Sequence, residues 1–234
     1  GRIPPPPPLP PTLNAIVGPA ETDTVAFDLF TATSGAFTAS SSDGAPLTFG
    51  ISGGTTGTTV VDGAPYDVSE AGPYGTLFVD SATGAYTFVP DNDAINALTE
   101  PTTTSFTITV SDGALSAAQE FTIAIHGTND AATISGNTSG EAVEAGDVSN
   151  AAALRAVTAT GTLTAADVDN TPNTFTAVTS PTPSTGGYGT FMITAAGVWA
   201  YTVDESNAKV QALNVGDTLT DSFTVTSVDG TPQL

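Results

Sequence analysis

Hydrophobic and polar residues alternate with a period of two along much of the chain. The clearest cases are Phe106-x-Ile108-x-Val110 and Trp199-x-Tyr201-x-Val203, in which Thr and Ala occupy the intervening positions. Successive side chains of a β-strand point to opposite faces of a sheet, so this pattern predicts half-buried antiparallel strands. Glycine turns at 62–63, 83–84, 112–113 and 229–230 separate such strands at short intervals. Helical patterns are confined to residues 92–98 and 206–213. The predicted fold class is therefore all-β, built from antiparallel β-sandwiches.

Two copies of one domain are visible when the chain is aligned with itself. The segment YGTLFVDSATGAYTFVPDNDAINAL from Tyr74 matches YGTFMITAAGVWAYTVDESNAKVQAL from Tyr188, and SFTITVSDG from Ser105 matches SFTVTSVDG from Ser222. We expect repeat 1 at residues 12–130 and repeat 2 at residues 131–234. Residues 1–11 are proline-rich and are predicted to form an extended polyproline spacer. Repeat 2 has no counterpart of the last predicted strand of repeat 1, and we expect its sandwich to be incomplete within this chain.

The composition limits the possible functions. The chain of 234 residues has 24 acidic and three basic residues, a formal net charge of −21. Binding to a nucleic-acid backbone requires several Lys or Arg, so nucleic acid is excluded as a partner. Cysteine is absent, which excludes disulfides and zinc–thiolate sites. No apolar run is long enough for a membrane span.

Several motifs in order resemble the VCBS repeat, a bacterial cadherin-like module. They are the Tyr-Gly-Thr-Phe motif, Trp199-Ala-Tyr-Thr-Val203, Lys209-Val-Gln-Ala-Leu213, DTLTDSFTVTSVDG from Asp217 and Gly127-Thr-Asn-Asp130. The resemblance covers essentially all of repeat 2 and residues 74–130 of repeat 1. It implies a non-enzymatic structural repeat of a large secreted bacterial surface adhesin or fibre, with calcium at its inter-domain joints. The implied location is extracellular, at the bacterial cell surface, and the implied partners are neighbouring repeats or subunits.

Calcium is also the metal that the acidic loops favour, because it takes six to eight oxygen ligands. The predicted ligands are Asn129, Asp130, Asp167, Asp169, Asp229, Asp93 and Glu21, with Asp91 and Asp23 as alternatives to the last two. In an Ig-like topology the loops holding Asp167, Asp169 and Asp229 lie at the end where the chain enters repeat 2. The Asp167-x-Asp169 pair becomes Ser41-x-Asp43 in repeat 1, so no equivalent site is expected there. Asp-Gly turns need no metal, which leaves a purely structural role open for Asp229.

Three functions remain open, and catalysis is not among them. The single His126 ends a strand, and no nucleophile has an evident activating partner. The first function is the calcium-stiffened adhesin repeat. The second is binding of cell-surface or matrix glycans, which would need an exposed aromatic patch; Trp199 alternates with other strand residues and is expected in the core. The third is a filament subunit in which a donor strand, with residues 13–17 as a candidate, completes repeat 2.

Overall fold

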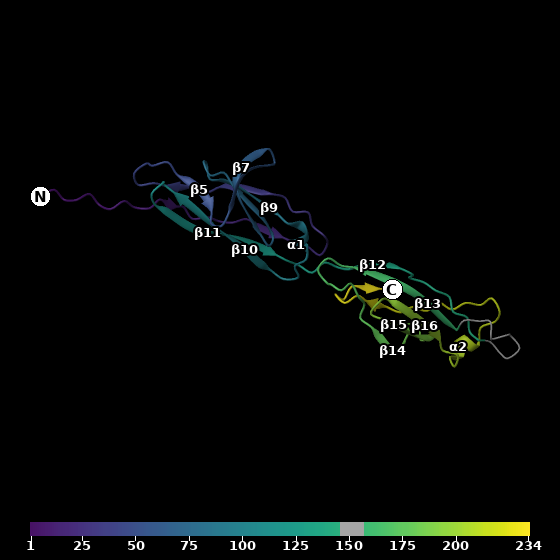
Figure 1. Cartoon of the computed structure of the whole chain (residues 1–234). Helices are drawn as coiled ribbons and strands as arrows, with labels where there is room; N and C mark the ends of the chain where they lie inside the picture. Colours follow the sequence, from purple (N-terminus) through teal and green to yellow (C-terminus); the bar gives the residue numbers. More distant parts are fainter. Residues whose placement is uncertain (146–156) are drawn as a thin grey trace. The chain divides into compact units, whose positions relative to one another are not determined.

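The computed structural model describes residues 1–145 and 157–234. Its contacts divide the chain into two compact units, which we call unit 1 (Gly1–Asn129) and unit 2 (Asp130–Leu234). The division falls one residue before the boundary expected from the repeat. Residues 1–10 are exposed, belong to no strand or helix and form an extended N-terminal segment (Figure 1). The described ranges contain no helix that is both long and apolar enough for a membrane span.

Unit 1 consists of two main sheets that enclose one apolar core (Figure 1). The larger sheet has the strand order β3 (Thr33–Ala36), β9 (Ala85–Pro90), β8 (Gly75–Val79), β7 (Ala64–Gly72) and β6 (Thr55–Val61). The smaller sheet has the order β2 (Ala20–Thr22), β11 (Ser116–His126), β10 (Thr102–Ser111) and β5 (Thr48–Ile51). Strand β2 pairs in parallel with β11, and the remaining pairs are antiparallel.

The core of unit 1 is formed by the alternating apolar residues that the sequence pattern identified. Phe106, Ile108 and Val110 of β10 point inward, and Phe121 of β11 contacts the rings of two aromatic residues, Phe37 and Tyr86. Burying such side chains stabilises the fold by about 1.5–3 kcal/mol each.

Residues 13–17, the candidate donor strand, are used within unit 1 itself. Strand β1 (Thr12–Leu13) pairs with β4 (Ala39–Ser40), and Leu13 and Ile16 pack against the core. Leu13 and Ile16 are thus half-buried in their own unit, whereas Val17 is 90% exposed, and the use of this segment as a donor strand stays a prediction.

Unit 2 has one five-stranded antiparallel sheet and a smaller second layer. The sheet order is β12 (Thr133–Gly136), β13 (Thr158–Ala166), β16 (Val198–Val203), β15 (Gly189–Ile193) and β14 (Val178–Pro183). The second layer contains the antiparallel pair β17 (Val225–Thr226) and β18 (Pro232–Gln233), with a bridge between Phe175 and Ser227. Trp199 is 4% exposed and belongs to the core, as predicted.

The two units repeat each other in structural detail. In unit 1 Val79 pairs with Tyr86, and in unit 2 Ile193 pairs with Trp199. The turn that joins these strands is one residue shorter in unit 2. Short helices follow in both units, α1 (Asn92–Asn96) and α2 (Ala208–Gln211), at the two predicted positions. The all-β prediction is confirmed.

Candidate metal-binding site

In unit 2 hydrogen bonds from backbone N–H groups link three acidic residues at the loop after β13. The Asp130 backbone N–H donates to Asp169 Oδ2 at 2.8 Å, and the Asp169 N–H donates to Asp167 Oδ1 at 3.1 Å. The second Asp167 oxygen, Oδ2, is buried and accepts no hydrogen bond from the described residues. This loop was singled out in the sequence because Asp167 and Asp169 alternate with an apolar residue.

Electrostatics in this loop disfavours ionisation of Asp169. Burial raises the pKa of Asp169 to about 6, and the nearby negative charges of Asp167 and Asp130 act in the same direction. Burying anions without cationic partners is costly. A cation bound at this loop would relieve both the desolvation and the repulsion.

Asp229 lies in the hairpin between β17 and β18, where hydrogen bonds satisfy its carboxylate. Its Oδ1 accepts from the Ser227 hydroxyl and from the Thr231 N–H, the latter at 3.1 Å. Its Oδ2 accepts from the Thr231 hydroxyl at 2.6 Å and from the Ala132 N–H at 3.1 Å. Burial opposes ionisation, yet these donors lower the pKa of Asp229 to about 2. Because Asp130 and Ala132 belong to one short segment, the Asp169 loop and the Asp229 hairpin are both anchored to it.

In unit 1 a second acidic pair is buried at β2. Glu21 pairs with Ile125 across the parallel ladder, and the Asp23 N–H donates to the His126 carbonyl at 3.0 Å. Asp23 Oδ2 accepts from the Thr128 N–H at 3.1 Å. Glu21 Oε1 and Asp23 Oδ1 are buried and accept no hydrogen bond within the described part of the chain. Burial raises the pKa of both carboxyl groups.

The structure therefore places Asp23, an alternative in the sequence prediction, in a more enclosed position than Asp93. Asp93 is in the first turn of α1 and is exposed. Two asparagines of α1 contact the loop at residues 28–30, and sequence reasoning missed them. Asn96 Oδ1 accepts from the Asp28 N–H at 2.6 Å, and Asn92 Oδ1 accepts from the Phe30 N–H at 2.8 Å. The cue available in the sequence was two amides four residues apart, which places them on one face of a helix.

Repeat 1 lacks the Asp-x-Asp pair, and its structure shows the consequence. Asp43 Oδ1 accepts from the Ser41 hydroxyl at 2.6 Å and from the Ala45 N–H at 3.0 Å, all in an exposed loop. The Ser41 hydroxyl and the Ala45 N–H lower the pKa of Asp43. Ser41 takes the place of Asp167 in repeat 1, and its hydroxyl donates a hydrogen bond to Asp43. In repeat 2 Asp167 is a carboxylate, and its Oδ2 accepts no hydrogen bond from the described residues.

Calcium fits the chemistry of these residues, although they form no preformed metal centre. Across residues 1–145 and 157–234, no three acidic, histidine or cysteine side chains converge closely enough to hold a metal. The donors at Glu21, Asp23 and Asp167 are nevertheless all oxygens, each with one buried oxygen atom that accepts no hydrogen bond. Hard oxygen donors in flexible loops are the ligands that Ca²⁺ prefers. Asn129 joins the two acidic regions along the chain, between Thr128 and Asp130.

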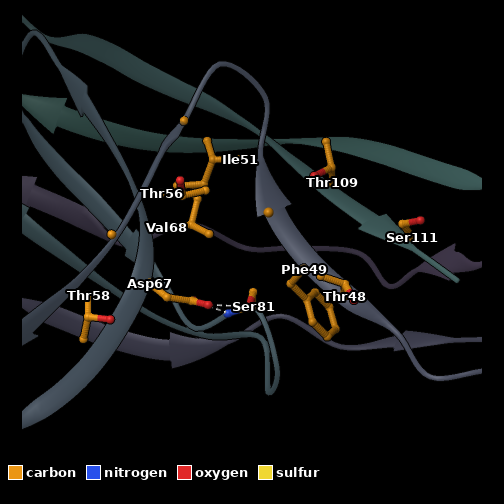
Figure 2. Close-up of a pocket in the computed structure, with 13 residues that line it drawn as sticks. Thr48, Phe49, Ile51, Thr56, Thr58, Asp67, Val68, Ser81, Thr109 and Ser111 are labelled. Atoms are coloured by element: carbon orange, nitrogen blue, oxygen red, sulfur yellow. Dashed lines mark hydrogen bonds between the residues drawn. The ribbon is translucent and has the colours of Figure 1, made fainter. Parts of the chain in front are cut away.

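A cavity of about 510 Å³ opens in unit 1 between β5, β7 and β10. Figure 2 shows hydroxyl groups of Thr48, Thr109 and Ser111 at its border, with Asp67 directed at Ser81. Asp67 accepts hydrogen bonds from the Ser81 N–H at 2.8 Å and hydroxyl at 2.5 Å, which lower its pKa. The one aromatic lining residue, Phe49, is only 8% exposed. Sugar binding commonly uses an exposed ring, so this cavity does not favour the glycan-binding alternative.

Asp221 is a second feature that sequence reasoning missed. Its carboxylate accepts five hydrogen bonds from Ser184 Oγ (2.5 Å), Gly186 N (2.7 Å), Tyr188 N (3.1 Å), Tyr201 Oη (2.7 Å) and Ser222 N (2.8 Å). Burial opposes ionisation, but these donors lower the pKa of Asp221. The residue ties the loop before β15 to the C-terminal layer of unit 2. All five donors lie in unit 2, so these hydrogen bonds stabilise that unit.

Comparison with known protein families gives a match for unit 2. The family model described as "Bacterial cadherin-like domain" matches residues 129–234. Residues 129–234 are therefore similar to a bacterial cadherin-like domain. The resemblance to a cadherin-like repeat is thereby confirmed, and such domains are structural modules of the adhesion type.

Solved cadherin structures align with most of the chain at low identity. Human protocadherin-24 EC1-2, in its Form II crystal structure, is 17% identical, with 84% of this chain and 80% of that chain covered and a TM-score of 0.34. The human desmocollin-1 ectodomain is 12% identical, with coverage of 95% and 35% and a TM-score of 0.32. The search of curated proteins gives no match.

Proposed function

We propose that this chain is an extracellular, non-catalytic adhesion or spacer module whose cadherin-like units bind calcium through buried carboxylates. The proposed unit 2 ligands are Asp130, Asp167, Asp169 and Asp229. The proposed unit 1 ligands are Glu21 and Asp23, with Asn129 and Asp93 as further oxygen donors. The bacterial cadherin-like domain of residues 129–234 supports the structural class of this function.

The observation that carries the proposal is the set of buried carboxylate oxygens with no donor. Glu21 Oε1, Asp23 Oδ1 and Asp167 Oδ2 accept no hydrogen bond and have no Lys or Arg partner among the described residues. A chain with 24 acidic and three basic residues cannot neutralise such groups internally. Leaving a buried charge without compensation costs several kcal/mol, so an external cation is the simplest source of compensation.

Calcium would act on the stiffness of the chain as well as on the stability of each unit. Thr128 is bound to Asp23 in unit 1, Asp130 is bound to Asp169 in unit 2, and only Asn129 separates them in sequence. We infer that calcium bound on both sides of Asn129 restricts rotation about this short connection. If the same restriction were repeated at each connection of a longer protein, a flexible row of domains would become stiff and extended.

The test is thermal unfolding and small-angle scattering of the full chain with calcium and with chelator. Extracellular calcium modules have dissociation constants of about 10⁻⁴–10⁻³ M. Calcium at tenfold excess over such a value stabilises a folded unit by about 1.4 kcal/mol. For a unit of this size the corresponding rise in Tm is about 6–11 °C.

Paired variants make the test specific. Asp167→Asn combined with Asp169→Asn is expected to abolish the calcium-dependent rise in unit 2, followed through Trp199, the only tryptophan. Asp43→Asn alters the equivalent loop of repeat 1 and is expected to leave that rise unchanged. Equal Tm values with calcium and chelator would refute calcium binding. A rise in Tm with unchanged scattering would refute only the stiffening.

A further inference from the structure

Unit 1 exposes three apolar side chains on the short segment that joins β2 to β3. Val25 is 65% exposed, Phe27 is 49% exposed and Leu29 is 78% exposed. From Phe27 to Ala32, exposed and half-buried residues alternate, which is the pattern of an extended strand with one solvated face. Isolated exposed apolar residues are ordinary, whereas neighbouring ones on a single segment indicate an interaction surface.

The opposite face of this segment is fixed to unit 1. Phe30 packs against the apolar core. The Asp28 N–H donates to Asn96 Oδ1 at 2.6 Å, and the Asp28 carbonyl accepts from Asn96 Nδ2 at 2.9 Å. Asn96 itself is fully buried. Phe27 and Leu29 each lie one position from a fixed residue, so they point to the other side and stay exposed.

The backbone of the same segment lies at an unpaired sheet edge, residues 27–36, which we call the open edge. Strand β3 pairs with β9 and has no strand on its second side in the described part of the chain. Strand β1 pairs with β4 farther along, and β2 pairs with β11 in the other sheet, so neither covers this edge. The backbones of Phe27 and Leu29 make no hydrogen bond to any described residue. The open edge contains no Pro or Lys, the residues that commonly protect such edges from pairing.

Negative charge surrounds the open edge. Asp91 and Asp93 are exposed at the start of α1, the helix whose asparagines hold the segment. The Asp28 carboxylate accepts from the Thr24 N–H at 2.6 Å, which lowers the pKa of Asp28 and keeps it ionised at neutral pH. Residues 3–154 contain neither Lys nor Arg. A partner with positive charge beside apolar side chains therefore complements this surface, whereas an acidic second copy or an anionic lipid surface does not.

We propose that the open edge binds an extended peptide in which apolar and basic residues alternate, added as a further strand beside β3. Its backbone bonds to Phe27 and Leu29, whose own backbone groups are unpaired. Its apolar side chains share a face with Phe27 and Leu29, and its basic side chains share the opposite face with Asp28. In strand addition, main-chain hydrogen bonds supply affinity and alternate side chains supply specificity. The inference does not depend on calcium, so it is tested in chelator and stands or falls apart from the calcium sites.

The probe is the fluorescein-labelled peptide Lys-Leu-Lys-Val-Lys-Leu-Lys, and its binding to the full chain is followed by anisotropy at physiological ionic strength. Lys-Ser-Lys-Ser-Lys-Ser-Lys keeps its charge, and Glu-Leu-Glu-Val-Glu-Leu-Glu keeps its apolar residues. The probe is expected to bind about tenfold or more tightly than either control peptide. Two further peptides carry N-methyl groups on the amides of the Lys residues or of the apolar residues. Alternate N–H groups of a strand point to opposite sides, so only one of these two should bind as the probe does.

A matched pair of protein variants locates the site. Phe27→Ser combined with Leu29→Ser removes two apolar contacts and leaves the hydrogen bonds of Asp28 in place. This double variant is expected to keep the wild-type Tm and to bind the probe about tenfold or more weakly. The control Val60→Ser removes an equally exposed apolar side chain on β6 and is expected to bind as the wild type does. In the wild type, the probe should slow amide hydrogen exchange at residues 27–31.

Equal binding of the probe by the wild type and the double variant would overturn the proposal. Equal binding of the two methylated peptides would do the same, and this arm uses the unaltered chain should the double variant not fold. Without tight binding of the probe, two other results would assign the open edge to a different occupant and contradict the proposal. Protection of residues 27–31 that grows with protein concentration would indicate a second copy, and binding to phosphatidylcholine vesicles that the double variant loses would indicate a lipid surface.

Discussion

Removal of the Asp221 carboxylate should destabilise unit 2 more than removal of any other single charged group near its surface. The variant Asp221→Ala deletes the acceptor of five hydrogen bonds. Ser184 keeps a second partner, since its hydroxyl also donates to the Gly189 carbonyl at 2.9 Å. The Gly186 N–H is exposed and can bind water. The partly buried Tyr188 N–H and Tyr201 hydroxyl lose the acceptor that the structure gives them.

The magnitude follows from these two donors. A buried donor without an acceptor costs about 1–3 kcal/mol, so the expected loss in the free energy of unfolding is about 2–6 kcal/mol. The corresponding fall in Tm is at least about 8 °C. Asp221→Asn keeps one neutral acceptor and should cost less, because hydrogen bonds to a charged group are roughly twice as strong as neutral ones.

Chemical and thermal unfolding followed at Trp199 report this change, since that residue lies in unit 2. Asp217→Asn is the matched control: it makes the same charge change in an exposed turn, where Asp217 accepts from the Asn214 N–H. A double-mutant cycle with Tyr201→Phe isolates one donor. In that background Asp221→Ala should cost about 1–3 kcal/mol less, because the orphaned hydroxyl is absent.

Two results would refute the reasoning about Asp221. One is a loss below about 1 kcal/mol, which would mean that water replaces the carboxylate without penalty. The other is an unchanged cost in the Tyr201→Phe background, which would show that the tyrosine hydroxyl is not held by Asp221.

Three further predictions concern pH, a turn and the core. Hydrogen bonds hold the pKa of Asp221 below its usual range. The stabilisation of unit 2 by this carboxylate should therefore be present above the unfolded pKa of about 3.9 and disappear as pH falls through the folded pKa. The difference in Tm between wild type and Asp221→Asn should narrow from pH 7 to pH 3. Gly197 has φ +86°, and a Cβ there would lie 2.1 Å from the Leu163 carbonyl oxygen. Gly197→Ala should therefore cost clearly more than Gly216→Ala, where φ is +94° and no atom lies within 4 Å; equal falls in Tm would contradict the clash. Phe121→Ala should cost about 3–5 kcal/mol in unit 1, measured by calorimetry, whereas Phe27→Ala, at a half-exposed position, should have a small effect.

The repeat is the feature that the sequence predicted best. Alternation fixed which residues of β10 and β16 face the core, because a period of two has only one inward set. The Asp-x-Asp spacing likewise identified the acidic loop of unit 2, since two carboxylates one residue apart repel without a packing benefit. The motif Tyr-Gly-Thr marked the start of β8 and β15 in both units.

Long-range pairing decided what local pattern could not. Nothing near Asp23 in sequence shows that Thr128 will donate to it, because the two residues are 105 positions apart and meet only through the parallel pairing of β2 with β11. The five donors to Asp221 come together for the same reason. Three lie in a loop more than thirty positions away, Tyr201 lies twenty positions away in β16, and Ser222 is adjacent. Asn92 and Asn96 are ordinary helix residues in the sequence and become anchors of the loop at Asp28 and Phe30 only after the sheets have packed.

The sequence by itself determined the all-β class, the two repeats, the inward face of each strong strand and the acidic loops that could hold calcium. Those properties depend on residues a few positions apart, where alternation and turn chemistry act. Only the tertiary structure showed that Leu13 and Ile16 pack in their own sandwich and that Asp23 is more deeply enclosed than Asp93. These properties depend on which distant strands pair and in which register, and register is set by burial of the whole sheet face rather than by any single segment.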